Sequence, residues 1–166
     1  IADNIRYGRL DATEEEVENA AKILHADGFI SQMKDGYQTI VHERGGGLSQ
    51  GQKQLIAFAR TLLADPRILV LAEATSSIDS QTEKLVQEGI ATLLKGRTSF
   101  IIAHRLSTIK SCTRILYIDG GRIMESGNHD ELMAKHSYYY ELYMSQYDKA
   151  ERSRAAAEVT AEGACL

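Results

Sequence analysis

Three segments of the chain carry apolar residues at helical spacing, and each of them opens with a capping box. In this pattern a Ser or Thr is followed three residues later by Glu or Gln, which predicts the start of a helix. The boxes are Thr13-x-x-Glu16, Ser49-x-x-Gln52 and Ser80-x-x-Glu83. The first helix is expected to reach about residue 26 before Gly28 stops it. The second ends before Pro66, and the third is followed by Gly96.

Two short apolar runs, residues 68–71 and 99–103, predict strands. Both are unbroken rather than alternating, which is typical of strands buried on both faces of a parallel sheet. Together with the helix expected at 80–95 they predict a right-handed βαβ unit. A further pair of runs, 115–118 and 122–125, flanks Asp119-Gly120-Gly121 and predicts a hairpin.

The last part of the chain predicts two more helices and an irregular end. The helices are expected at about 129–135 and 137–150, and the second carries Tyr138, Tyr139, Tyr140, Tyr143 and Tyr147. We interpret these tyrosines as packing residues whose hydroxyls reach solvent. Residues 151–166 are rich in Ala and Glu and lack apolar periodicity, so we expect a disordered tail there.

The composition is that of a soluble globular protein and excludes several classes of function. Of 166 residues, 43% are hydrophobic, which supplies enough apolar material for a core. The formal net charge of −4 argues against a nucleic-acid partner, which would require a basic surface. No apolar run approaches the ~20 residues that span a bilayer, and no signal segment is recognisable. Cys112 and Cys165 lie far apart, so neither a zinc site nor a disulfide is expected.

Two polar residues lie just beyond the predicted parallel strands. Glu73 comes after the run 68–71, and His104 after the run 99–103. Ligands of open α/β sheets bind beyond the carboxyl ends of the strands, so both side chains are candidates for chemistry. A Glu there could deprotonate water, and a His could bind developing negative charge. The alternatives, a turn cap for Glu73 and a half-buried structural ring for His104, stay open.

A glycine-rich loop leads into the second predicted helix. The residues Gly45-Gly46-Gly47 precede Leu48, and the capping box of Ser49 and Gln52 forms the first helical turn. Free backbone N–H groups, a serine hydroxyl and the positive end of the helix dipole together form an anion site, for which phosphate is the obvious ligand. A flexible turn followed by an ordinary cap explains the same residues without a ligand.

Five segments in series resemble the motifs of nucleotide-binding domains of ATP-binding cassette (ABC) exporters. They are the signature motif and its helix at 48–60, the Walker B strand at 67–73, the D-loop at 76–79, the switch-histidine segment at 101–108 and the exporter segment at 125–132. Ile5-Arg6-Tyr7-Gly8 also resembles the exporter sequence just after the Q-loop. The resemblance covers about residues 1–147 in the order and at the spacing of the family.

The resemblance implies an α/β fold, with a RecA-like P-loop NTPase core and an α-helical subdomain. Residues 1–66 would form the helical subdomain, residues 67–150 part of the core, and residues 151–166 the tail. Two such domains close head to tail around ATP, so that each ATP contacts the signature loop of the other subunit. The residues carried over to that loop are Leu48, Ser49, Gln50, Gly51 and Gln52. Glu73 would polarise the attacking water, His104 would contact the γ-phosphate, and Ser77 and Asp79 would lie at the interface.

Three departures from the family pattern limit what the chain can do alone. The sequence contains no G-x-x-x-x-G-K-[ST], so the Walker A loop is absent. Ala72 occupies the position of the Walker B aspartate and cannot bind Mg²⁺, so no metal ligand is assigned. Gln50 stands where the signature usually has Gly. Because the chain also begins at Ile1 rather than Met, we expect a fragment whose Walker A half lies upstream.

The leading hypothesis is therefore a fragment of the ATPase domain of an ABC exporter. It implies ATP and Mg²⁺ as cofactors of the intact parent and none for the isolated chain, which we expect to be soluble and inactive. The implied partners are a second nucleotide-binding domain and a transmembrane domain, at the cytoplasmic face of the cell membrane. The alternative is a non-catalytic dimerisation module that lends its signature loop to an active partner. The acidic charge disfavours a third class, ABC ATPases that act on DNA.

Overall fold

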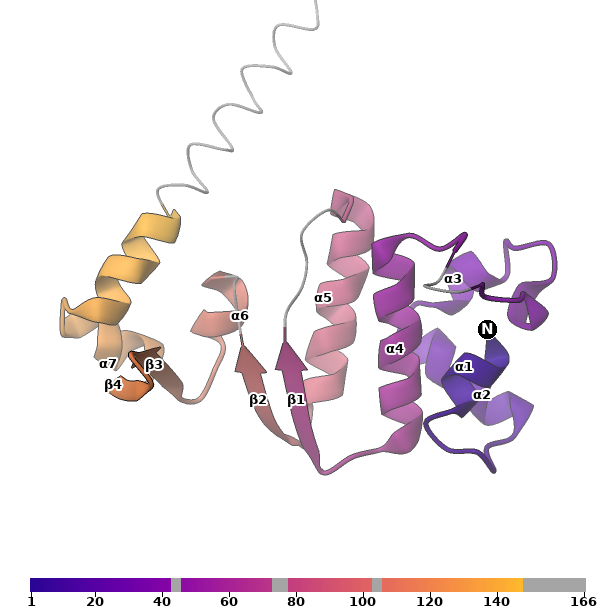
Figure 1. Ribbon diagram of the computed structural model, residues 1–166, viewed down its shortest axis with the longest axis horizontal. Helices are drawn as coiled ribbons and strands as arrows, with labels where there is room; N and C mark the ends of the chain where they lie inside the picture. Colours follow the sequence, from indigo (N-terminus) through magenta and orange to yellow (C-terminus); the bar gives the residue numbers. More distant parts are fainter. Residues whose placement is uncertain (43–45, 73–77, 103–105, 148–166) are drawn as a thin grey trace, which may run out of the picture. The chain divides into compact units, whose positions relative to one another are not determined.

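The computed structural model describes residues 1–42, 46–72, 78–102 and 106–147. The chain divides into two compact units, Ile1–Ile101 and Ile102–Leu166. Figure 1 labels the helices and strands of both units along the chain.

The first unit consists mainly of helices. In chain order it contains α1 (Ala2–Arg6), α2 (Glu14–Ile23), α3 (Asp27–Ile30), the short 3-10 helix η1 (Gly36–Gln38), α4 (Gln50–Ala64), β1 (Ile68–Ala72), α5 (Ser80–Leu94) and β2 (Thr98–Ile102). Two of the predicted capping boxes are confirmed, because Thr13 with Glu16 and Ser49 with Gln52 each form both reciprocal hydrogen bonds. The short helices α1, α3 and η1 were not predicted from the pattern.

The strands β1 and β2 are neighbours in a two-stranded sheet, and Figure 1 shows their arrows pointing in the same direction. Since α5 connects them, the predicted βαβ unit is present. Leu69 and Leu71 belong to the helical core or pack against it. The opposite face of the sheet is bare in the described part of the chain: Ile68, Val70, Phe100 and Ile102 are each at least 60% exposed. The predicted burial of both faces is therefore wrong for the described residues, which bury only one face of the sheet.

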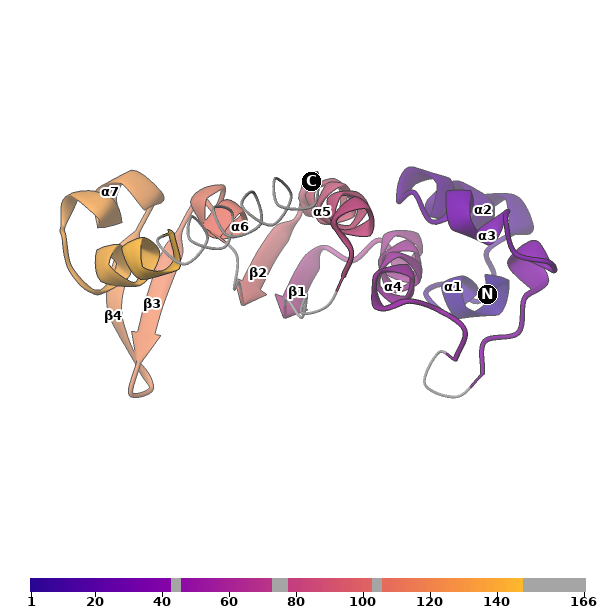
Figure 2. The same ribbon diagram turned by 90° about the horizontal axis from the view of Figure 1, so that it is seen from above.

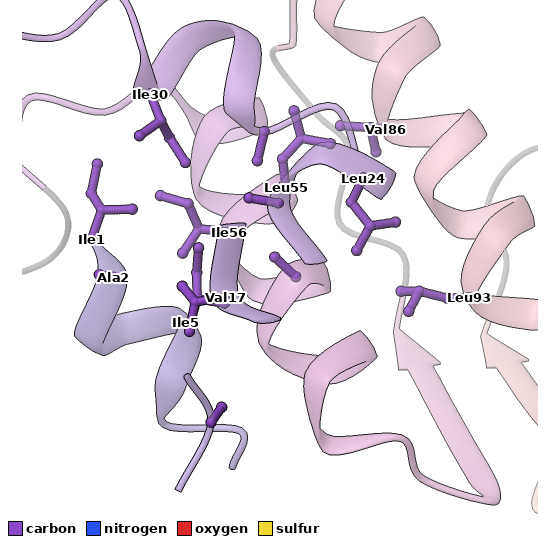
Figure 3. Packing of buried hydrophobic residues seen from close by; sticks show 14 of the residues in the cluster. Ile1, Ala2, Ile5, Val17, Leu24, Ile30, Leu55, Ile56, Val86 and Leu93 are labelled. Carbon is purple, nitrogen blue, oxygen red and sulfur yellow. The ribbon is translucent and has the colours of Figure 1, made fainter. Parts of the chain in front are cut away.

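The core of the first unit lies where α1, α2, α4 and α5 meet (Figure 3). Its largest fully buried side chains come from all four helices, among them Ile5, Val17, Leu55, Val86 and Leu93. Figure 2 shows α4 and α5 side by side, with the shorter helices beside α4. The core therefore fixes α4 and α5 against each other.

Two helix boundaries differ from the sequence prediction. The first helix ends at Ile23, not near residue 26, because His25 adopts a left-handed conformation (φ 59°) and turns the chain. Gly28 then lies inside α3 and does not stop a helix. The cap of α5 is Asp79 rather than Ser80: the carboxylate accepts a hydrogen bond from the backbone N–H of Thr82. Asp and Ser cap equally well, and the charge of Asp suits the helix dipole.

The second unit contains α6 (Leu106–Lys110), the antiparallel hairpin of β3 (Ile115–Asp119) and β4 (Arg122–Gly127), and α7 (His129–Ala134). Residues 138–147 form a further helix. The predicted hairpin is confirmed, with Asp119 opposite Arg122 at the turn and a register shift between Tyr117 and Ile118. Asn128 caps α7 through a box with Glu131, which the pattern of Ser or Thr boxes did not predict.

The tyrosines at the start of the last helix do pack, but Tyr139 does so without a hydroxyl in solvent. Tyr139 is buried, and its hydroxyl lies 2.9 Å from Nδ1 of His129. Burial raises the pKa of Tyr139 to about 12. Tyr138 stacks on Tyr117 of β3, with ring centroids 5.7 Å apart. These contacts attach the last helix to the hairpin and to α7.

Glu125 is a buried carboxylate of β4 that caps this last helix from outside. Its Oε2 accepts a hydrogen bond of 2.8 Å from the backbone N–H of Tyr139, in the first helical turn. The N-terminal end of a helix has unsatisfied N–H groups, and a negative charge there is favourable. Glu125 therefore ties β4 to the helix 138–147.

We predict that Glu125→Ala lowers the free energy of unfolding by about 1–3 kcal/mol, because it leaves a buried N–H group without an acceptor. Glu125→Gln retains an oxygen acceptor and should lose less. Denaturant unfolding of both variants, beside the exposed control Glu141→Ala, measures the difference. Equal losses for Glu125→Ala and Glu141→Ala would contradict the role of Glu125 as a cap.

Candidate functional site

The candidate site begins at the first turn of α4, where the capping box uses specific atoms of Ser49 and Gln52. The backbone N–H of Gln52 donates to Oγ of Ser49 (3.2 Å), and the backbone N–H of Ser49 donates to Oε1 of Gln52 (2.9 Å). The hydroxyl of Ser49 accepts in this arrangement, so its own proton can point outward. The side-chain carbonyl of Gln52 is occupied by the box.

The first turn of α4 presents hydrogen-bond donors to the outside. The backbone N–H of Lys53 already bonds to the carbonyl of Ser49 (3.0 Å). Helix geometry directs the N–H groups of Gln50 and Gly51 beyond the end of the helix, since no earlier turn supplies acceptors. Ser49 and Gln50 are exposed, and Leu48 is half-buried. The exposed turn thus offers donors and the positive end of a 15-residue helix, which suits an anion.

A cavity of about 250 Å³ lies beside this turn. Leu48, Lys53 and Arg60 line it, together with Asn4, Val41, Ile56 and Ala57. Arg60 is held in place by α1, because its Nε donates to the carbonyl of Asn4 (2.7 Å) and its Nη2 to Oδ1 of Asn4 (3.0 Å). Two cationic side chains therefore line the cavity, Lys53 from the first turn of α4 and Arg60 from its third turn.

Gly51 serves packing, independently of any ligand. It is buried, and a Cβ atom at this position would overlap Cγ2 of Thr82 and lie 3.2 Å from Cγ2 of Ile78. Thr82 is in the first turn of α5, and Ile78 lies just before that helix. A side chain at residue 51 would push the first turns of α4 and α5 apart, so the contact itself requires glycine here.

Asp79 fixes the first turn of α5. Its Oδ1 accepts a hydrogen bond of 2.9 Å from the backbone N–H of Thr82. This backbone hydrogen bond is the main reason why the pKa of Asp79 is below its ordinary value. Figure 1 shows that α4 and α5 run parallel and begin on the side toward which β1 and β2 point. Two helix dipoles thus direct their positive ends to the same edge, where β1 also ends at Ala72.

The site residues predicted from the sequence are only partly placed. Leu48, Ser49, Gln50, Gly51 and Gln52 form one turn, and Gly51 brings this turn next to the segment of Asp79. Glu73, Ser77 and His104 lie outside the described residues. Sequence reasoning missed Thr82, although Thr82, Val86, Gly89 and Leu93 repeat at the same spacing as Gly51, Leu55, Phe58 and Leu62.

The described residues do not form a site for Mg²⁺. Ala72 is exposed at the end of β1 and offers only a methyl group. Across the described ranges, no group of three His, Cys, Asp or Glu side chains is placed to hold a metal ion. The N–H and O–H groups at the start of α4 are hydrogen-bond donors, which match phosphate oxygens and not a cation.

No helix in the part of the chain that the structure describes is long and apolar enough to span a bilayer.

Comparison with known proteins identifies relatives along almost the whole chain. The family model described as ABC transporter matches residues 3–76. An uncharacterized ABC transporter ATP-binding protein, YknV of Bacillus subtilis, is 55% identical over 150 residues, which are 90% of this chain and 25% of that protein. An ATP-dependent lipid A-core flippase of Legionella pneumophila is 50% identical over 146 residues, which are 88% of this chain and 25% of the flippase.

A solved structure described as a bacterial Atm1-family ABC exporter with ATP bound has the same fold. It superimposes with a TM-score of 0.78 and 42% sequence identity, over 87% of this chain and 25% of that one. The matched part of the chain therefore spans about a quarter of the length of each of these three proteins.

We predict that the cap of Asp79 makes α5 sensitive to acid. Because the pKa of Asp79 is lower in the folded chain than its ordinary value of 3.8, its stabilisation is present above that value. It is lost as the pH falls through the lowered folded pKa. Asp79→Asn caps without titrating, so this variant should lose less stability on acidification than the parent.

Thermal unfolding from about pH 6 to about pH 2 tests this difference. The matched control is Asp35→Asn, because Asp35 makes no side-chain cap hydrogen bond to η1. Identical pH profiles for the parent and Asp79→Asn would show that protonation of Asp79 does not cause the loss of stability in acid.

Proposed function

The chain belongs to the ABC transporter family, and from this membership we propose that it is part of the ATPase domain of an exporter. In this role the loop Leu48–Gln52 contacts the phosphates of an ATP molecule that a second ATP-binding domain holds. The observation that carries the proposal is the first turn of α4, with its outward donors and exposed Ser49. The intact ATPase uses ATP and Mg²⁺, as its family implies.

The chemistry of this turn suits the γ-phosphate. Phosphoryl transfer needs positioning and charge stabilisation more than covalent help from the protein. The hydroxyl proton of Ser49 and the N–H groups of Gln50 and Gly51 supply neutral donors, and a hydrogen bond to a charged oxygen is stronger than one between neutral groups. Lys53 adds a positive charge one turn further along. We assign to this turn the binding and orientation of the phosphate.

The roles proposed for Glu73 and His104 follow from the family motifs. Glu73 follows β1 and would orient and deprotonate the attacking water. His104 follows β2 and would donate a hydrogen bond to the γ-phosphate. Because β1 and β2 are parallel neighbours, both strands end at the same edge of the sheet. Ser77 and Asp79 are assigned to the contact between the two ATP-binding domains.

A second candidate function rests on Ala72. A methyl group at the end of β1 cannot bind Mg²⁺ directly or through water, so the chain would support an ATP site of its own poorly. In this alternative function, the chain is a non-catalytic module whose loop at Ser49 contacts the ATP of an active partner. The presence of Glu73 favours a catalytic ATPase domain, because a domain that does not hydrolyse ATP does not need a general base.

The partners proposed for the whole protein are a second ATP-binding domain and a transmembrane domain. The relatives of which this chain matches 25% include a flippase and an exporter. We place the ATPase part at the cytoplasmic face of the cell membrane, where it couples ATP binding and hydrolysis to export.

We predict that two substitutions of Ser49 separate capping from phosphate binding. Ser49→Ala should cost about 1 kcal/mol of stability as a lost cap. Ser49→Asp keeps the cap and suits the helix dipole, so it should fold as stably as the parent. Facing a phosphate, however, its negative charge should prevent ATP-driven association with an ABC domain that carries an intact phosphate loop.

The measurement is association of the two domains at increasing ATP concentration, beside the melting temperature of each variant. For Ser49→Ala we expect the required ATP concentration to rise about tenfold, as for the loss of one hydrogen bond to a charged group. If Ser49→Asp associates as the parent does, Ser49 is only a cap and the phosphate does not bind at this turn.

We also predict that the chain alone binds ATP with Mg²⁺ negligibly, because it has neither a G-x-x-x-x-G-K-[ST] loop nor a metal ligand at residue 72. Calorimetric titration measures this, with an ABC domain that has an intact phosphate loop as the positive control. Saturable binding at micromolar ATP would contradict the assignment of ATP to the partner domain.

A further inference from the structure

The helices α4 and α5 meet at two glycines that receive side chains from opposite directions. Gly51 of α4 lies against the methyl group of Thr82 on α5. Gly89 of α5 lies against Phe58 of α4, whose Cδ2 is 3.2 Å from the position of a Cβ at residue 89. Seven residues separate the two contact positions on each helix, which is two helical turns. The contacts thus repeat with the same register along the pair.

Apolar side chains fill the seam between and beyond these glycines. Leu55 and Val86 are buried at the positions between them, and Leu93 is buried one step beyond. The spacing of four and three residues along both helices is that of a heptad seam. Thr82 fits against Gly51, and Phe58 fits against Gly89. These two contacts prevent the helices from sliding along each other, because a shift in either direction moves one of the two side chains into a neighbouring residue.

The far ends of the two helices are joined as well. Arg97, which follows α5, donates from Nη1 to the carbonyl of Leu93 (2.8 Å) and from Nη2 to Oδ1 of Asp65 (2.7 Å). Asp65 is the C-terminal cap of α4. The side chain of Arg97 is only 13% exposed, whereas that of Asp65 is 83% exposed. The contact of Thr82 with Gly51 is the corresponding junction at the N-terminal ends.

We propose that Thr82 is a positioning residue that couples the turn at Ser49 to the turn at Asp79, so that both move as one body. Its methyl group occupies the space beside Gly51, and its backbone N–H binds Asp79. A displacement of the Ser49 turn by a phosphate is therefore transmitted through Thr82 to Asp79. The functional meaning of the coupling rests on the proposed binding of phosphate at Ser49, but the mechanical coupling itself does not.

Thr82→Ser tests this role because it removes only the methyl group and keeps the hydroxyl and the backbone N–H. The matched control is Thr92→Ser on the same helix, away from the N-terminal junction; the hydroxyl of Thr92 donates to the carbonyl of Glu88 (2.9 Å). The probe is amide hydrogen exchange of the full chain, at two amides of each turn. Gln52 and Lys53 bond to Ser49, and Thr82 and Glu83 bond to Asp79.

For Thr82→Ser we expect exchange to become about fourfold faster at all four amides, as for the loss of one buried methyl group. Thr92→Ser should leave them unchanged. Faster exchange at Thr82 and Glu83 alone, or the same change in both variants, would overturn the coupling. This result is independent of ATP and of any partner.

A rescue experiment distinguishes coupling from a merely local loss of packing. Gly51→Ala should lower the melting temperature because its methyl group collides with that of Thr82. Thr82→Ser removes the opposing methyl group, so the double variant should regain stability relative to Gly51→Ala. The control pair of Gly51→Ala with Thr92→Ser should show no recovery, and recovery in both pairs or in neither would overturn the assignment.

The functional arm measures ATP-driven association with an ABC domain that has an intact phosphate loop. Thr82→Ser should raise the required ATP concentration about fourfold, while Thr92→Ser should not change it. Coupled exchange without any change in association would overturn the role in positioning. A parent chain that fails to associate would overturn the proposed function, whereas the exchange and rescue results would still decide whether the coupling exists.

Discussion

The close packing of α4 on α5 is the constraint on which the rest of the candidate site depends. Without a side chain at Gly51, the first turns of the two helices come together and both positive helix ends reach the same edge. The parallel strands β1 and β2 end toward this edge too, because α5 connects them as a crossover helix. A single contact between two helices thus assembles donors, dipoles and strand ends that lie far apart in sequence.

Local signals predicted local structure well. The boxes at Thr13 and Ser49 form as expected, because each depends on atoms within one turn. The start of α5 was wrong by one residue, since Asp79 and Ser80 are both good caps and only the chain path selects between them. The predicted end of α2 was wrong. Gly28 is a strong stop signal in the sequence, but the residue that turns the chain is His25. His25 also lies 3.4 Å from the carboxylate of Glu88 on α5.

Contacts between helices were the part of the site that the sequence could not supply. Ser49 and Asp79 were identified from motifs, but Thr82 carries no motif of its own and matters only through its contact with Gly51. A comparison of the spacing along both helices could have found it, because the heptad pattern is present in each. The sheet is a second example. Unbroken apolar strands predict a sheet that is buried on both faces, but the described residues leave the face of Val70 and Phe100 exposed. Glu73 and His104 remain predictions.

The glycine of the loop therefore meets two requirements that act in the same direction. A residue that brings backbone N–H groups close to a phosphate must be small, and so must a residue on which another helix packs. At Gly51 the packing requirement is visible in the structure. This contact requires a glycine whether or not the chain binds ATP. The presence of Gly51 is consequently weak evidence for phosphate binding. Ser49 is the better evidence, because its exposed hydroxyl has a proton that the cap does not use.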